Sequence, residues 1–237
     1  MIEILRGVVG SHAYGMAHKG SDIDTAAIHV QPTLALVGLD MGERPDETFT
    51  TKSPDTLSRE LRSYLFLALK NNPAAMDLVW LTDYVTLTDW GAELVGLRET
   101  FLSQRIRDSY LKYAHSQFEK LQKSGRFTNV PVNRMEKNAR HMLRLVQQAT
   151  GIWVTGKLHV EVDNPAGIRE RAHHIVTDPK GPDYALRHLA AVESYFDDTP
   201  TALPEHPDPA PAADFLRRVR SAYMKEGQWD HSLTPAR

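Results

Sequence analysis

Hydrophobic and polar positions alternate in two short stretches near the N-terminus. Residues 2–9 (IEILRGVV) and 22–30 (DIDTAAIHV) are rich in apolar and β-branched side chains, a pattern typical of half-buried strands. A turn at Gly10-Ser11 ends the first stretch, and a segment rich in small residues joins it to the second. Residues 31–54 contain several prolines and glycines, so we expect a loop there.

A helical period follows this segment. Leucines recur at every fourth position from residue 57 to residue 69, which predicts an amphipathic helix over about residues 56–70, ended by Asn71-Asn72-Pro73. A Pro-rich linker is predicted at residues 199–211. The same reasoning predicts further helices at residues 74–81, 100–123, 132–155 (between Pro131 and Gly156), 183–197 and 210–226, and either a short strand or a connector at 84–87.

These patterns predict an α+β fold, in which strands packed with helices are followed by an α-helical region. The predicted domains are residues 1–90, a helical domain at residues 91–198, and a Pro-rich linker with a C-terminal helix at residues 199–237. A chain of 237 residues buries enough surface to fold without disulfides or a structural metal.

The composition excludes several classes of protein. The absence of cysteine excludes a disulfide scaffold and Cys-ligated zinc. The formal charge is -2, with Lys+Arg 28 against Asp+Glu 30, so a nucleic-acid partner would have to bind a local patch. The N-terminus lacks the apolar core of a signal peptide, and no run of about 18 apolar residues exists to span a membrane. We therefore expect a soluble cytoplasmic protein without a membrane partner; its oligomeric state is not predicted.

Asp22 and Asp24 are the strongest candidates for chemistry. On a strand, residues two apart point to the same face, which would place these carboxylates about 6–7 Å apart. Such a pair can share divalent cations of the Mg²⁺ type. Ile23 is then expected to point into the core. The alternative is a surface turn with two exposed acids, and the apolar stretch after Asp24 argues against it.

Gly10 and Ser11 precede this acidic pair and suit a phosphate. Glycine allows the backbone to approach a ligand closely, and Ser11 offers a hydroxyl and a backbone N–H. A short helix after Ser11 would add its N-terminal amides to the anion site. A phosphate site beside a metal site is the arrangement that phosphoryl or nucleotidyl transfer requires.

The segment GSHAYGMAHKGSDIDTAAIHV (residues 10–30) resembles the DNA polymerase β-type nucleotidyltransferases. It is most similar to the branch of predicted nucleotidyltransferases associated with the RNA repair pathway, whose members begin with a Gly-Ser-x-Ala-Tyr-Gly segment leading to Ser-Asp-x-Asp. The resemblance covers about residues 6–175 and implies a small mixed-sheet nucleotidyltransferase core. Similar segments continue at residues 55–62 (DTLSRELR), 67–73 (LALKNNP), 138–145 (NARHMLRL) and 155–158 (TGKL).

The resemblance implies that Asp22, Asp24 and a third carboxylate bind Mg²⁺ or Mn²⁺ and act in catalysis. By motif position the third carboxylate is Asp55, and the competing interpretation is that Asp55 caps the N-terminus of the helix that follows. Asp46 and Glu47 are further candidates if the strands lie elsewhere.

Further side chains are expected to contact the nucleotide. Tyr14 either stacks or hydrogen-bonds near it or is a core aromatic, and Ser21 either orients the metal pair or caps a turn. Lys70, Arg140, His141 and Arg144 form either a cationic face toward the triphosphate or a solvated helix face. His141 and Arg144 share a helix face because they are three residues apart, and the resemblance favours them over Arg140.

The expected function is Mg²⁺-dependent transfer of a nucleoside monophosphate from a nucleoside triphosphate to an acceptor hydroxyl. The resemblance implies an RNA end as acceptor, while tRNA, protein and small-molecule hydroxyls stay open. The alternative is a catalytically silent nucleotide-binding or partner subunit of the same fold. A small-molecule acceptor predicts a closed pocket between the two halves. A nucleic-acid acceptor predicts a basic groove, for which the candidates, otherwise an ordinary solvated surface, are Arg105, Arg107, Lys112, Lys120, Lys123, Arg126, Arg134 and Lys137.

Overall fold

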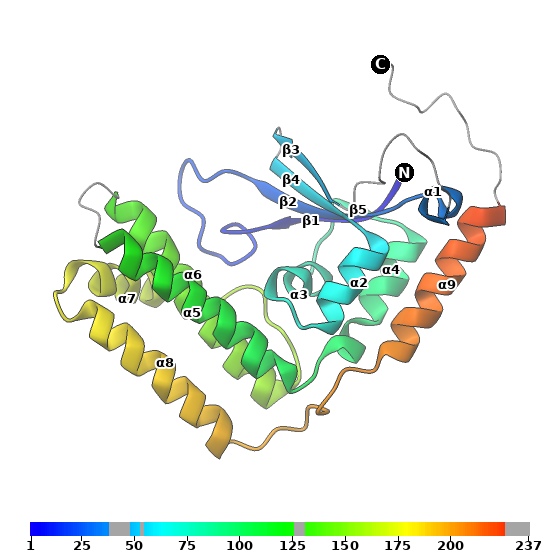
Figure 1. Cartoon of the computed structure of the whole chain (residues 1–237). Helices are drawn as coiled ribbons and strands as arrows, with labels where there is room; N and C mark the ends of the chain where they lie inside the picture. The colour runs from blue at the N-terminus through cyan, green and yellow to red at the C-terminus, as the bar shows by residue number, and fades with distance from the viewer. Residues whose placement is uncertain (38–47, 53–54, 126–130, 226–237) are drawn as a thin grey trace.

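A β-sheet covered on one face by helices forms the N-terminal part of the protein, and a group of longer helices follows it (Figure 1). This arrangement confirms the predicted α+β class. The computed structural model describes residues 1–37, 48–52, 55–125 and 131–225.

The sheet is mixed and has the strand order β3-β4-β2-β1-β5. β2 and β4 run parallel, and the other neighbouring strands run antiparallel. The parallel pair matters most for the site, because it aligns the first residues of both strands. The strands are β1 (Ile2–Val9), β2 (Asp24–Val30), β3 (Thr48–Lys52), β4 (Asp55–Glu60) and β5 (Thr86–Leu87).

The predicted helix over residues 56–70 is wrong in its first third. Residues 55–60 form β4, and helix α2 (Leu61–Leu69) begins only after Glu60, whose side chain accepts a hydrogen bond from the backbone N–H of Arg62. Leu57 fits the helical period of the later leucines, but it lies on the strand beside Ala26 of β2. Pairing with β2 thus overrides a periodic pattern that extended too far toward the N-terminus.

The loop predicted over residues 31–54 also contains regular structure. A short helix, α1 (Thr33–Val37), follows β2, and β3 (Thr48–Lys52) pairs with β4. The prolines and glycines of this segment lie mainly at residues 38–47 and 53–54, outside the described residues.

Three shorter helical elements complete the N-terminal part. α3 (Pro73–Val79) packs against β1, and Asn72 caps its N-terminus by accepting a hydrogen bond from Ala75 N. α4 (Asp89–Gly96), which was not predicted, spans the predicted domain boundary at residue 90 and also packs on β1. A 3₁₀ helix, η1 (Arg98–Phe101), follows it.

Helix α5 (Arg105–Gly125) begins five residues later than predicted, whereas the other predicted long helices agree closely with the sequence pattern. α6 (Val132–Thr155) has the predicted bounds, because Pro131 precedes it and Gly156 ends it with a left-handed φ of 65°. α5 packs along α6 and is its main partner. α7 (Pro165–Thr177) was not predicted. The next helix of this part is α8 (Gly181–Asp198).

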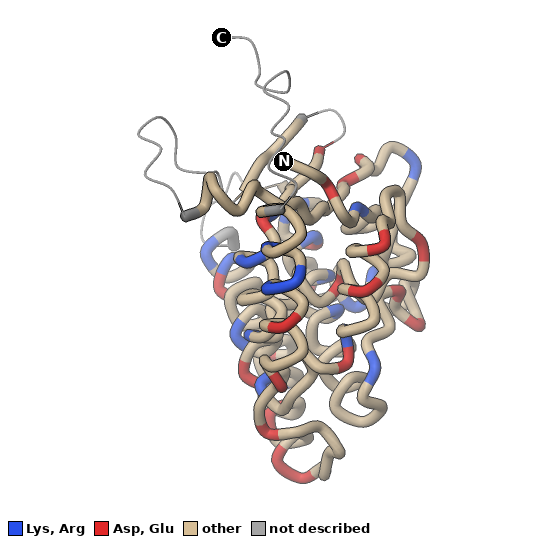
Figure 2. The backbone as a smooth tube through the Cα atoms, turned by 90° about the vertical axis from the view of Figure 1, so that its right-hand side faces the viewer, with Lys and Arg blue, Asp and Glu red and all other residues tan. Residues whose placement is uncertain are grey.

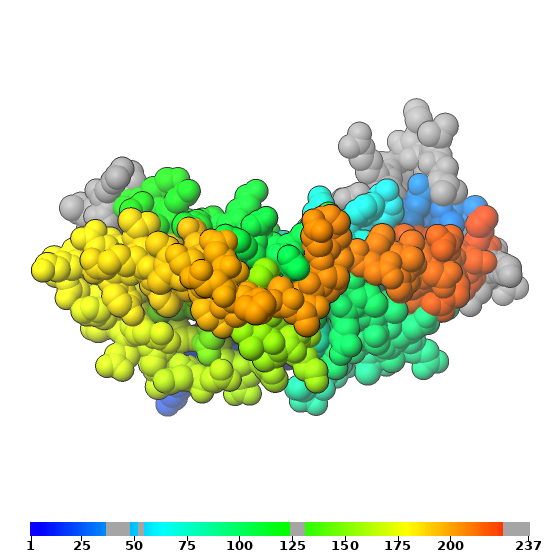
Figure 3. Space-filling model, turned by 90° about the horizontal axis from the view of Figure 1, so that it is seen from below, coloured from blue at the N-terminus to red at the C-terminus, as the bar shows by residue number. Residues whose placement is uncertain are grey.

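The C-terminal segment crosses back to the sheet-containing part. Figures 1 and 3 show α8, the Pro-rich segment and α9 (Pro209–Lys225) as one continuous run along the underside of the molecule. Trp153 Nε1 donates to Thr199 O at 2.8 Å and Gln104 N donates to Pro204 O at 2.8 Å, so the predicted linker is fixed to the helices beneath it. α9 packs against α1, α2 and η1.

Basic and acidic residues are interspersed along the described backbone on the side where α9 lies (Figure 2). None of the helices that the structure describes is both long enough and apolar enough to cross a membrane.

Candidate active site

A tight loop after β1 places the Gly10-Ser11 turn directly beside Asp24. Gly10 has a φ of +72°, and a Cβ at this position would lie 2.8 Å from Asp24 Oδ2. Any larger residue would therefore displace the carboxylate. Tyr14 N donates to Gly10 O at 3.1 Å and Met16 N to Ser11 O at 2.9 Å, so the loop folds back on itself.

The same loop offers free backbone donors. Of the two alternatives, a loop or a short helix, the structure shows a loop of successive turns. Within the part of the chain that the structure describes, the backbone N–H groups of Ser11, His12 and Ala13 have no hydrogen-bond acceptor. Consecutive free N–H groups at a turn bind anions. The turn therefore offers the donors that an anion site needs, without a helix.

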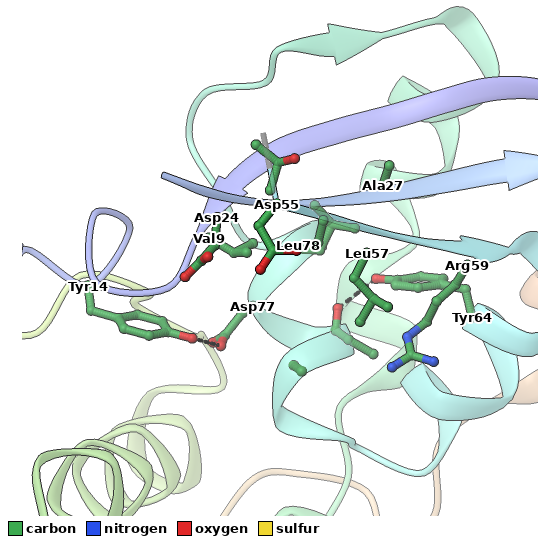
Figure 4. Close-up of a pocket in the computed structure, with 14 residues that line it drawn as sticks. Val9, Tyr14, Asp24, Ala27, Asp55, Leu57, Arg59, Tyr64, Asp77 and Leu78 are labelled. Atoms are coloured by element: carbon green, nitrogen blue, oxygen red, sulfur yellow. Dashed lines mark hydrogen bonds between the residues drawn. The ribbon is translucent and has the colours of Figure 1, made fainter. Parts of the chain in front are cut away.

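Asp24 and Asp55 are direct neighbours across the parallel strands. They are register partners at the first positions of β2 and β4, so their Cα atoms are about 5 Å apart. The next pair, Thr25 and Thr56, is buried and joined by a hydroxyl–hydroxyl hydrogen bond of 2.7 Å, which fixes the register. Figure 4 shows both carboxylates directed into the same cavity. The competing prediction for Asp55 is wrong, because Glu60 caps α2.

Asp22 lies near Asp24, but on a loop and not on the predicted strand. β2 begins at Asp24, so Asp22 lies in the preceding loop and strand alternation does not place it. For the same reason Ile23 is 55% exposed, and the prediction that it points into the core is wrong. Ser21 Oγ accepts a hydrogen bond from His18 N at 2.9 Å, so Ser21 caps this loop.

Two cavities meet at Asp24 and Tyr14. The larger, of about 400 Å³, lies between the loop of residues 10–24 and α6. The smaller, of about 250 Å³, lies between the sheet and the helices α2 and α3, and Asp55 lines it (Figure 4). Asp24 and Tyr14 line both cavities.

The larger cavity brings together most of the predicted site. Lys137 and Arg140 of α6 also line it. Lys70 does not reach either cavity; it lines a separate cleft beside α5, so it shares no cationic face with Arg144. Asp46 and Glu47 lie outside the described residues. The predicted residues that line the larger cavity are Gly10, Ser11, Tyr14, Ser21, Asp22, Asp24, His141 and Arg144.

A buried polar cluster forms the wall between the two cavities. Tyr14 Oη donates to Asp77 Oδ2 at 2.7 Å, and Arg144 Nη1 lies 3.2 Å from the same oxygen. The Arg144 guanidinium also lies over the Tyr14 ring, 3.8 Å from its centroid, and donates to Gln148 Oε1 at 2.6 Å. These contacts join the loop after β1 to α3 and α6.

Burial and charge oppose each other in this cluster. Burial raises the pKa of Asp77, although Arg144 acts in the opposite direction. Burial also raises the pKa of Tyr14, and Asp77 raises it further, so the phenol keeps its proton. For Arg144, burial alone would lower the pKa, but Asp77 and Tyr14 hold it above the ordinary value. Asp77 was not predicted as a site residue, because within its own helix it resembles any other polar position.

His141 is neutral in the free protein. Burial lowers its pKa to about 3, and the nearby charges of Arg144, Lys120 and Lys137 act in the same direction. It therefore offers a hydrogen bond to the larger cavity at neutral pH, and no positive charge. The positive charges there are Lys137, Arg140, whose Nη1 lies 3.6 Å from Glu136 Oε2, and Arg144.

The chemistry of the aspartates suits a divalent metal with open positions. Among the described residues, Asp22, Asp24 and Asp55 have no side-chain hydrogen bond or ion pair, and no three His, Cys, Asp or Glu side chains are grouped closely enough for a metal site made by protein alone. Mg²⁺ is usually held by one or two carboxylates, waters and substrate phosphates. The pair Asp24–Asp55, with Asp22 nearby in the larger cavity, fits that manner of binding.

The sequence model of the RNA repair pathway DNA polymerase beta family, RlaP, matches residues 3–175. The chain belongs to this family. Membership of a polymerase β-like family implies nucleotidyltransferase activity in general terms. No curated protein matches the chain.

The family match ends within α7, so α8 and α9 lie outside the matched residues. All residues that line the two cavities lie inside the match. The site described above is therefore built entirely from the part of the chain that shows the family.

Proposed function

We propose that this protein transfers a nucleoside monophosphate from a metal-bound nucleoside triphosphate to an acceptor hydroxyl, in the first instance that of an RNA end. The observation that supports this most strongly is the direct pairing of Asp24 with Asp55 beside the Gly10-Ser11 turn. Asp24 lines both cavities and Asp55 lines the smaller one, so one cavity is available for each reactant.

The larger cavity suits the triphosphate. The free N–H groups of Ser11 and its two neighbours provide hydrogen-bond donors, and Lys137 and Arg140 provide positive charge on the opposite wall. Neutral His141 adds a hydrogen bond to this wall. Asp22, Asp24 and Asp55 would hold Mg²⁺ or Mn²⁺, which neutralises the charge that develops on the transferred phosphate.

The smaller cavity suits the acceptor. An acceptor hydroxyl beside Asp55 attacks the α-phosphorus and forms a new P–O bond. The bond between the α-phosphorus and the oxygen that bridges to the β-phosphate breaks, and pyrophosphate leaves. Asp55 accepts the proton of the hydroxyl. The family description supports an RNA end as the acceptor, and tRNA is included in the test below.

The direct test follows the label of the nucleotide. Purified protein is incubated with Mg²⁺ or Mn²⁺, each nucleoside triphosphate, and RNA oligomers, tRNA or protein extract. We expect the α-phosphate label to enter an acceptor and the γ-phosphate label to leave as pyrophosphate. Asp24→Asn and Asp55→Asn should each lower kcat by about 10²- to 10⁴-fold, because each keeps the shape of the side chain and removes its charge.

The matched control is Asp183→Asn, which removes an exposed carboxylate from α8, far along the chain from both cavities. It should leave the transfer rate unchanged. Transfer of the γ-phosphate label to an acceptor would contradict nucleotidyl transfer, and so would α-label transfer that persists unchanged in Asp24→Asn.

A further inference from the structure

Arg59 is a basic residue in the smaller cavity without an acidic partner among the described residues. It lies on β4 four positions after Asp55, so both side chains project from the same face of the sheet. Both line the cavity, and Figure 4 shows Arg59 on the side away from Tyr14. The cavity therefore has a carboxylate where the hydroxyl is proposed to react and a guanidinium farther along the strand.

A second group of basic residues lines a neighbouring cleft. This cleft of about 540 Å³ lies between α5 and the end of α2, and its basic residues are Lys70, Arg105 and Lys112. None of the three forms an ion pair within the described part of the chain, and one acid, Asp108, lines the same cleft. Tyr113 lines the cleft and is 40% exposed, and its hydroxyl accepts a hydrogen bond from Asn72 Nδ2.

The α2–α3 turn separates this cleft from the smaller cavity. Ala74 and Ala75 line the cavity on one side of the turn, and Lys70 lines the cleft on the other. The turn is held firmly, because Asn71 is fully buried and Ser109 Oγ donates to its carbonyl oxygen at 2.8 Å. The positions of the basic residues relative to Asp55 are therefore set by packed backbone.

We propose that Arg59, Lys70, Arg105, Lys112 and Tyr113 form the binding surface for a single-stranded polynucleotide acceptor. This inference rests on the proposed function and names the class of its acceptor. The terminal nucleotide occupies the smaller cavity with its hydroxyl at Asp55. The preceding phosphates lie against Arg59 and then, across the α2–α3 turn, against the basic residues of the cleft.

The spacing of the cations favours a chain of phosphates over a single anion. α2 has nine residues and separates Arg59 from Lys70, so their backbone positions are about 13 Å apart along the helix. The two side chains line different cavities, so they suit successive phosphates of a polynucleotide better than one phosphate. An exposed aromatic ring beside basic residues is the usual combination in proteins that bind single strands, because bases stack on the ring.

The test measures binding and does not depend on catalysis. A fluorescent single-stranded RNA of about 12 nucleotides is titrated with the full-length protein at several salt concentrations. Four phosphate contacts predict that a plot of log K against log [salt] has a slope of about -3. The loss of one contact should make this slope less steep by about 0.7. Arg59→Gln, Lys70→Gln and Lys112→Gln should each weaken binding and reduce the slope, and Tyr113→Ala should weaken binding roughly tenfold with no change in slope.

Two variants serve as matched controls. Lys70→Arg keeps the charge and should keep the slope. Lys123 lies on α5 outside the cleft, with its Nζ 3.8 Å from Glu119 Oε2. Lys123→Gln should therefore bind RNA as the unchanged protein does. Equal affinities and slopes in all variants would overturn the proposal, and so would displacement of the RNA by an acidic peptide together with loss of the salt dependence.

The outcome can be separated from that of the proposed function. If RNA binds through these residues but receives no nucleotide, the surface stands and the reaction is wrong. If nucleotide is transferred to a protein or small molecule at the same rate in Arg59→Gln and Lys112→Gln, the reaction stands and the polynucleotide surface is overturned.

Discussion

Asp77 accepts hydrogen bonds from side chains on two separate segments of the chain. Tyr14 comes from the loop after β1, and Arg144 and Gln148 come from α6. Gln148 Nε2 also donates to Val160 O at 3.2 Å, beyond the end of α6. A single buried carboxylate thus holds the wall between the larger and the smaller cavity.

Removal of this charge should destabilise the protein. Asp77→Asn leaves Arg144 buried without a counter-charge, which should lower the free energy of unfolding by about 3–5 kcal/mol, measured by urea denaturation. Arg144→Met should have a similar effect for the reciprocal reason. The double variant Asp77→Asn/Arg144→Met should lose about 1–3 kcal/mol less free energy of unfolding than the sum of the two single losses. Strict additivity would contradict the coupling of these two residues.

Site residues that lie close to their partners along the chain could be predicted from the sequence, and those with distant partners could not. Gly10, Ser11, Asp22 and Asp24 lie within fifteen residues of each other, so their spacing alone indicated one site. Asp55 was found through the resemblance to a family motif, since nothing local aligns it with Asp24. Asp77 was missed because its partners lie 63 and 67 residues away, where sequence periodicity gives no information.

Helix α9 lies beyond the residues matched by the family and still contacts the core that bears the site. Arg220 forms an ion pair with Glu60 and donates to Gln31 O at 3.1 Å, and Thr33 Oγ1 donates to Arg220 O at 2.8 Å. Glu60 in turn caps α2 directly after β4. The C-terminal helix thereby stabilises the strand that positions Asp55.

Loss of this ion pair should affect stability more than the loss of an exposed one. Arg220→Gln leaves buried Glu60 without its charged partner, and we expect a decrease of about 1–3 kcal/mol in the free energy of unfolding. Arg217→Gln on the same helix removes a side chain that is 71% exposed and should change stability by less than about 0.5 kcal/mol. Equal denaturation midpoints for the two variants would show that α9 does not secure the core through Arg220.

The pattern of hydrophobic residues predicted long helices better than short elements. α6 was predicted at both ends, because 24 residues contain many helical periods and a clear start and stop. α1, β3 and β4 each have six residues or fewer, and β4 was assigned to a helix. Such short elements depend on pairing with distant strands, which the local pattern does not contain.

At the scale of the whole molecule, the sheet and the helical part contribute different components of one site. The sheet presents Asp24 and Asp55, the loop after β1 presents backbone N–H groups, and α6 presents Lys137 and Arg140. α5 and the end of α2 add the basic cleft. This arrangement places the proposed triphosphate and acceptor on opposite sides of Asp24.

The central claim is that Asp24 and Asp55 act together with a divalent metal on a nucleotide. The most direct measurement uses electron paramagnetic resonance to follow the binding of Mn²⁺ to the protein. It is made with and without a nucleoside triphosphate analogue that cannot be cleaved between its α- and β-phosphates. No acceptor is needed. We predict that each ligand strengthens the binding of the other, and that Asp24→Asn and Asp55→Asn each weaken Mn²⁺ binding by about tenfold or more. Nucleotide binding that is equally tight with excess chelator and in both variants would contradict the account.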